Sequence, residues 1–168
     1  MKFVPYKTEV RFLKIDDRFT VYDIVSEQQT PIVMQRFAQS RWTFPMLLYF
    51  ESHPFEKEDI LNVPLQVEQI PSKKKMISFS MKGFHREHLL AFVVRIENEA
   101  MLEQALAEFF YVAEQNLLFA LTNEPCLFYK GYHVTISSQT GEILLADYDG
   151  QATIFLTKSK EDFNAKMD

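Results

Sequence analysis

The chain has 168 residues, a length typical of a single domain, and its 47% share of hydrophobic residues excludes an intrinsically disordered protein. Its 18 Lys and Arg against 23 Asp and Glu leave a formal charge of −5. This balance argues against a nucleic-acid partner, because phosphate binding needs a concentrated basic face. The single cysteine, Cys126, excludes a disulfide scaffold.

The sequence also indicates location and cofactor use. No uncharged stretch approaches the ~18 apolar residues that a membrane-spanning helix needs, and the first residues do not form the apolar core of a signal peptide. We therefore expect a cytoplasmic protein without a membrane partner. Only four glycines are present, and phosphate-cradling loops depend on glycine, so we expect no cofactor.

In the first third of the chain, alternation of apolar and polar residues predicts a hairpin formed by strands over 8–15 and 19–25. The stretch 31–40 fits a short helix with a proline in its first turn, and a strand over 32–37 fits nearly as well. A compact apolar run over 44–50 predicts a buried strand.

The middle of the chain is predicted to contain, in order, a helical turn over 54–61 and strands over 63–70, 76–81 and 89–96. The second of these strands places Ile77, Phe79 and Met81 on one face and serines on the other. The last is almost entirely apolar, which predicts a central strand covered on both faces. The basic run over 73–75 is interpreted as a solvated turn between strands.

The longest predicted element is a helix over 99–121, with Asn98 as its N-cap. Its apolar residues recur at intervals of three and four and comprise Leu102, Leu106, Phe109, Ala113, Leu117 and Ala120. Further apolar residues widen the apolar surface beyond this stripe, so the helix could also pack against another subunit.

The last third of the chain predicts a meander of strands over 127–137, 142–148 and 152–157. An Asp-Gly pair separates the last two strands, and this pair is a strong hairpin signal. Ser159 is then expected to cap a short C-terminal helix.

These elements predict one α+β domain over residues 1–168. Its mostly antiparallel sheet would be packed by the long helix over 99–121 and by the short C-terminal helix, and it would end in the three-stranded meander.

Histidines supply the candidate ligand or metal site. His85 and His88 lie three residues apart, and His53 or His133 could complete a ligand set if the segment were helical. The segment precedes a strand, however, and strand residues three apart face opposite ways.

Two groups of residues are candidates for binding another protein. Arg41 and Trp42 belong to residue types enriched at interface hot spots, although a lone Trp also packs well in a core. The acidic turns contain Asp16, Asp17, Asp147 and Asp149, which could steer a basic partner.

The end of the chain resembles a known family. Residues 141–145, the Asp-Tyr-Asp-Gly turn over 147–150, the following strand and the segment 160–163 are similar to the end of SMI1/KNR4-type bacterial immunity domains. The resemblance covers about the last 25 residues. It implies a small, acidic, non-catalytic protein of the immunity type.

No catalytic signature is present, so we expect a non-enzymatic protein-interaction domain of the inhibitor, immunity or regulatory type, with a protein partner. One alternative is a small-molecule-binding protein or small enzyme with a Phe-lined pocket between the sheet and the long helix. The other is a homo-oligomeric structural component.

Overall fold

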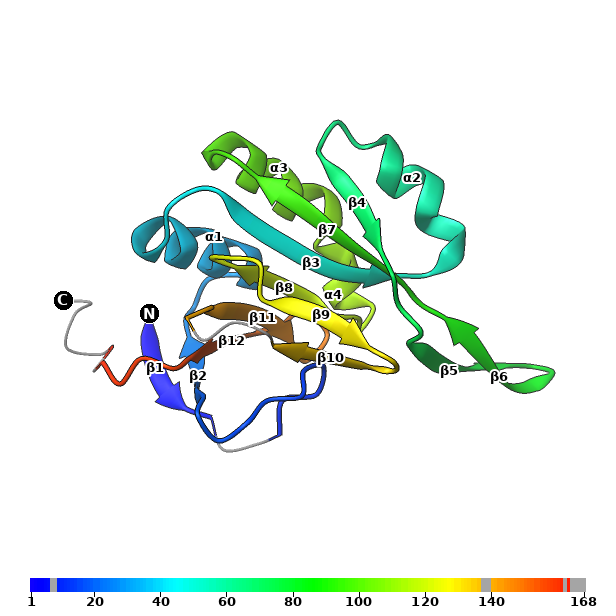
Figure 1. The fold of residues 1–168 in the computed structure, drawn as a ribbon, viewed down its shortest axis with the longest axis horizontal. Coiled ribbons are helices and arrows are strands. Elements are labelled where there is room, and N and C mark those ends of the chain that lie inside the picture. The colour runs from blue at the N-terminus through cyan, green and yellow to red at the C-terminus, as the bar shows by residue number, and fades with distance from the viewer. Residues whose placement is uncertain (7–8, 137–139, 162, 164–168) are drawn as a thin grey trace.

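A computed structural model describes the chain apart from residues 7–8, 137–139, 162 and 164–168 (Figure 1). Its centre is an eight-stranded sheet in which all paired strands run antiparallel. From one edge to the other the strands are β1 (Lys2–Pro5), β2 (Thr20–Val25), β12 (Ala152–Thr157), β11 (Ile143–Asp147), β8 (Phe119–Thr122), β3 (Met46–Ser52), β7 (Leu90–Ile96) and β4 (Val67–Ile70). The α+β class and the mostly antiparallel sheet are confirmed.

Helices cover one face of this sheet. They are α1 (Thr30–Arg41), the single turn η1 (Pro54–Glu56), α2 (Lys57–Asn62), α3 (Glu99–Phe109) and α4 (Tyr111–Glu114). Phe37 of α1 and Phe109 of α3 are buried in the same apolar cluster as Phe50 of β3 and Phe92 of β7. The rings of Phe50 and Phe109 stack with centroids 4.7 Å apart. Packed rings therefore occupy this part of the space between the sheet and the helices.

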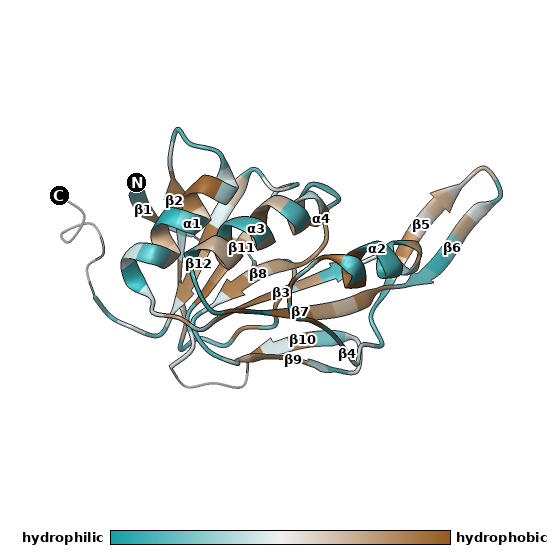
Figure 2. Cartoon of the chain, turned by 90° about the horizontal axis from the view of Figure 1, so that it is seen from above, coloured by the Kyte–Doolittle hydropathy of each residue, from teal (hydrophilic) through white to brown (hydrophobic). Residues whose placement is uncertain are grey.

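The opposite face of the sheet is covered by a small hairpin, β9 (Leu127–Lys130) with β10 (His133–Ile136), and by the segment 9–15. Figure 2 shows this hairpin and the helices on opposite sides of the sheet. In β3, alternate side chains enter the two clusters, Leu48 toward the helices and Leu47 toward β9 and β10. The strand is buried throughout, which explains its unbroken apolar sequence.

The predicted long helix is shorter than expected. Asn98 caps it as predicted, since its side chain accepts a hydrogen bond from the amide of Met101 at 3.0 Å. The helix α3 ends at Phe109, however, and residues 119–122 form strand β8. Of the apolar residues that widened the predicted helical stripe, Val112 lies in the short helix α4 and Phe119 in β8, a strand that is buried throughout.

Other elements differ from the prediction in their pairing. Strand β2 pairs with β1, whereas the predicted partner over 8–15 contains no strand among its described residues. The open choice over 31–40 resolves as helix α1. Residues 127–136 form their own hairpin, with Gly131 in its turn, and not the first strand of a meander. The hairpin of β11 and β12 is confirmed, and most of the predicted C-terminal helix lies outside the described residues.

Candidate functional site

A second hairpin projects from one end of the molecule (Figures 1 and 2). It consists of β5 (Lys75–Ser80) and β6 (Gly83–His88), which pair antiparallel and form no part of the main sheet. Gly83 follows the two-residue turn at φ +105°, a conformation that favours glycine. We call residues 75–88 the arm.

The two faces of the arm differ in chemistry. Residues directly opposite each other in an antiparallel pair share a face, and the register therefore defines the two sets. One face, which we call the arm face, carries Lys75, Ile77, Phe79, Phe84, Arg86 and His88. It combines three large apolar side chains with cationic or titratable basic groups, and it contains no acid.

The apolar side chains of the arm face are exposed to solvent. Phe79 and Phe84 are 76% and 73% exposed, and Ile77 is 59% exposed. The two rings contact each other with centroids 4.2 Å apart. Monomeric proteins rarely expose contiguous apolar groups without a function, so this patch is the main candidate for a binding surface.

The opposite face of the arm contacts the rest of the protein near its base. Met76 packs against the helix-side core. Glu87 accepts a hydrogen bond from Nδ1 of His53 at 3.1 Å, and the His53 ring stacks on that of Phe55. Because these contacts are made by the opposite face, the arm face points away from the place where the arm is attached to the body.

An ion pair between the partly buried Lys74 and the buried Glu51 fixes the base of the arm. The Nζ of Lys74 donates to Oε1 of Glu51 at 2.7 Å, and the Glu51 side chain is fully buried in β3. The other oxygen, Oε2, and the hydroxyl of Tyr129 are both buried, and neither has a hydrogen bond of good geometry within the described residues. Burial raises the pKa of Glu51, and burial followed by the charge of Glu51 raises that of Tyr129.

Charge is distributed unevenly between the arm and the rest of the chain. Residues 72–88 contain five Lys or Arg and one Glu, a formal charge of +4. Because the whole chain carries −5, the remaining residues carry −9. The arm is thus a basic, apolar projection on an acidic protein.

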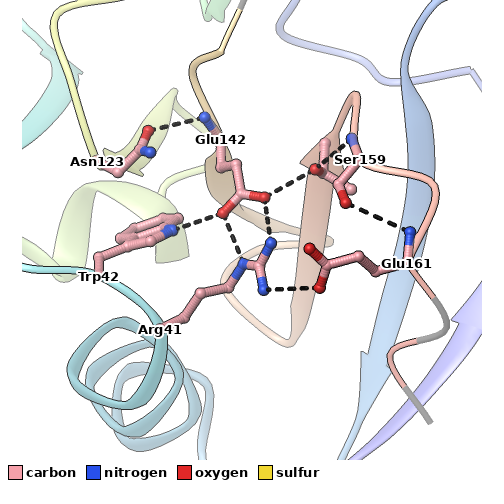
Figure 3. Close-up of polar contacts among 7 residues, drawn as sticks. Arg41, Trp42, Asn123, Glu142, Ser159 and Glu161 are labelled. Atoms are coloured by element: carbon pink, nitrogen blue, oxygen red, sulfur yellow. Dashed lines mark hydrogen bonds and ion pairs between the residues drawn. The ribbon is translucent and has the colours of Figure 1, made fainter. Parts of the chain in front are cut away.

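Trp42 is buried and Arg41 is partly buried, and both contact the carboxylate of Glu142. Trp42 is 7% exposed, and its indole nitrogen donates to Glu142 Oε2 at 2.8 Å. Arg41 donates to both oxygens of the same carboxylate, at 2.6 and 2.5 Å (Figure 3). Its guanidinium lies 4.8 Å from the centre of the Phe163 ring.

Further contacts complete the network around Glu142. Its Oε1 accepts a hydrogen bond from the hydroxyl of Thr157 at 2.8 Å, and its amide donates to Asn123 Oδ1 at 2.8 Å. Arg41 also approaches the carboxylate of Glu161 at 3.9 Å. The network joins α1 to the strands β11 and β12, so it stabilises the fold.

The first acidic turn is exposed but partly neutralised. Arg18 Nε donates to both carboxylate oxygens of Asp16 at 3.0 Å. This hydrogen bond holds the pKa of Asp16 well below its usual value, at about 2. Asp17 is exposed beside the pair.

The second acidic turn is divided between core and surface. Asp147 is buried, and its Oδ1 accepts hydrogen bonds from Arg11 Nε at 2.8 Å and from the amide of Tyr148 at 2.8 Å. Asp149 is exposed in the turn at φ +55°. Of this pair, Asp149 has the side chain that is exposed to solvent.

The candidate histidines do not form a group. His85 and His88 lie on opposite faces of β6, because they are three residues apart in one strand. His133 lies on β10 at the other face of the sheet. Among the described residues, no three His, Cys, Asp or Glu side chains come together as a metal site.

The sequence contains a signal for the arm that the prediction did not use. Strand β6 has the sequence Gly-Phe-His-Arg-Glu-His, with one apolar side chain in six residues. A strand with so few apolar side chains cannot lie in a core. The hairpin that it forms with residues 75–80 is therefore expected outside the core. Glu51 and Glu142 give no such signal, since their burial depends on distant partners.

Comparisons of the chain with protein-family models, with curated proteins and with solved structures found no match. The similarity of the C-terminal segment to immunity domains stays a prediction. Within the described ranges, no helix has the length and apolar character needed to cross a membrane. The function is therefore argued from the geometry of the arm.

Proposed function

We propose that this chain is a non-enzymatic protein-interaction domain, of the inhibitor, immunity or regulatory type, that binds its protein partner through the arm face. The observation that carries this proposal is the exposed Phe79–Phe84 pair flanked by Lys75 and Arg86 on one side of a projecting hairpin. Aromatic residues and Arg are the types enriched at the centres of protein interfaces.

The attachment of the arm supports the same function. The ion pair of Lys74 with the buried Glu51 and the His53–Glu87 contact hold the base of the arm against β3 and the residue just before η1. A rigid base limits the conformational entropy that the arm loses when a partner binds. A cytoplasmic location, expected from the sequence, is part of the proposal.

The test is a capture experiment with three forms of the tagged chain in an extract of its source cells. We expect the wild type to retain a stoichiometric protein partner, and the Phe79→Ser/Phe84→Ser variant to lose it. Tyr132→Ser is the matched control, because Tyr132 is an exposed aromatic residue in the turn of the other hairpin. Equal retention by all three forms would remove the arm face as the binding surface.

A further inference from the structure

The body of the protein contains an acidic pocket with the opposite character to the arm face. This pocket, of 280 Å³, lies between α2 and the helices α3 and α4. Its apolar residues include Ile60 and Phe109, which are buried, and Tyr111. Three carboxylates, those of Glu56, Asp59 and Glu108, also line it.

The carboxylates of Glu56 and Asp59 give the pocket a negative electrostatic potential. Burial raises the pKa of Tyr111, and the charges of Glu56 and of Asp59 raise it further. Glu56 accepts a hydrogen bond from the hydroxyl of Ser52, which orients it. The pocket therefore offers an apolar floor within a negative field.

The arm face matches this pocket in size and in charge. An apolar cavity of about 150 Å³ can hold a benzene molecule, so a pocket of 280 Å³ has room for one Phe ring, and the second ring of the arm would lie against its rim. Beside Phe79 and Phe84, the side chains of Lys75 and Arg86 would meet the three carboxylates. No acid on the arm face would oppose them.

The arm and the acidic pocket lie at the same end of the molecule. Figure 1 shows α2, which lines the pocket, and the arm at that end, and the contact of Glu87 with His53 joins β6 to the residue just before η1. A two-fold axis at this end can place each arm against the pocket of the other copy. Such an interface is isologous: both copies contribute the same surface, and no surface is left open for a third copy.

The area of this reciprocal contact reaches the size of a specific interface. Two copies contribute four exposed Phe rings, which amount to roughly 500 Å² on the basis of 150–250 Å² for each complete side chain. The surfaces that contact the rings bury a similar solvent-accessible area. The total buried area is therefore about the 1,000 Å² expected for a biological interface.

We infer that the partner of the arm is a second copy of this chain, with the arm face of each protomer bound in the acidic pocket of the other. This inference rests on the proposed function, since it names the partner of the same surface. The charge of +4 over residues 72–88, the arm with the three residues before it, against −9 over the remaining residues supports it.

The first test measures the mass of the purified full chain by sedimentation velocity over a range of concentrations. We expect a dimer whose dissociation constant rises at least tenfold in Phe79→Ser/Phe84→Ser, and also in Glu56→Gln/Asp59→Asn/Glu108→Gln. The control with the same change of charge, Glu27→Gln/Glu97→Gln/Glu103→Gln, alters exposed acids elsewhere and should dimerise as the wild type does. Raising the salt concentration should weaken the dimer, because it screens charges at the rim.

The second test exchanges charges between the two surfaces. Lys75→Glu/Arg86→Glu places acids on the arm, and Asp59→Lys/Glu108→Lys places bases at the pocket. Each variant alone should be monomeric, because like charges meet. An equimolar mixture should form a heterodimer in which both contacts pair opposite charges, and this recovery also shows that both variants are folded.

The outcomes separate this inference from the proposed function. A wild type that stays monomeric at 500 µM, or a mixture that does not associate, overturns the second copy as partner. If the arm variant then loses a different protein in the capture experiment, the proposed function stands without the inference. If the arm instead carries the chain onto anionic phospholipid vesicles and captures no protein, both are overturned.

Discussion

The body and the arm use the same residue type for opposite purposes. In the body, Phe50, Phe92 and Phe109 are buried between the sheet and the helices, where each ring contacts another. In the arm, Phe79 and Phe84 contact each other and remain exposed. The comparison shows that Phe occupies two environments, since one group of rings stabilises the fold and the other is exposed to solvent.

The strongest way to test this contrast is to remove one ring from each region. Phe92→Ala should lower the free energy of unfolding by about 3–5 kcal/mol, because it leaves a cavity in the core. Phe84→Ala should change it by less than about 0.5 kcal/mol, because its ring is already in water. Urea unfolding followed by circular dichroism measures both. A similar loss in the two variants would show that the arm is part of the core.

The polar network of the body gives the next largest effect. Glu142→Ala should cost about 3 kcal/mol, because it leaves Arg41 and the indole nitrogen of Trp42 without their acceptor. Glu97→Ala removes a carboxylate from an exposed ion pair with Arg95 and should cost less than about 1 kcal/mol. The same unfolding experiment compares them, and equal costs would contradict a stabilising role for the buried carboxylate.

The junction between arm and body gives a smaller effect that depends on pH. Lys74→Met should cost about 2 kcal/mol at pH 8, since it leaves the charge of Glu51 buried without its partner. The folded-state pKa of Glu51 is raised above the ordinary 4.5, so folding favours the protonated carboxyl and stability falls as the pH rises through the folded-state value. Lys74 opposes this fall by stabilising the carboxylate.

The cost of Lys74→Met should therefore be small below pH 4.5, where Glu51 is protonated in both states, and should grow at higher pH. Lys73→Met is the control, because Lys73 is exposed and adjacent. A cost that does not change with pH would show that Lys74 acts through packing alone.

The sequence predicted the elements whose pattern depends on near neighbours. The strand over 44–50, the Asn98 cap and the Asp-Gly hairpin are examples, and each depends on side chains within a few positions. Residues 119–121 were predicted as helix because a strand buried on both faces and a buried helix end are both continuously apolar. Only the pairing of β8 with β3 and β11 distinguishes them.

The candidate sites were harder to predict because their partners are distant in sequence. Trp42 and Glu142 are separated by 100 positions, and nothing local shows that the carboxylate lies beneath the indole. Asp147 depends in the same way on Arg11. The arm, by contrast, is local, and the polar sequence of β6 beside an apolar β5 is a pattern that can be recognised in other chains.

The way in which the arm joins the body makes it separable. The amide of Leu89, just after β6, donates to the carbonyl oxygen of Lys74, just before β5, at 3.0 Å. The two segments that connect the arm to the body therefore meet side by side, and a short turn could replace residues 75–88 without moving either end. The arm can thus be treated as an insertion, which could be transplanted into another two-stranded junction or deleted to leave a body that keeps its main sheet.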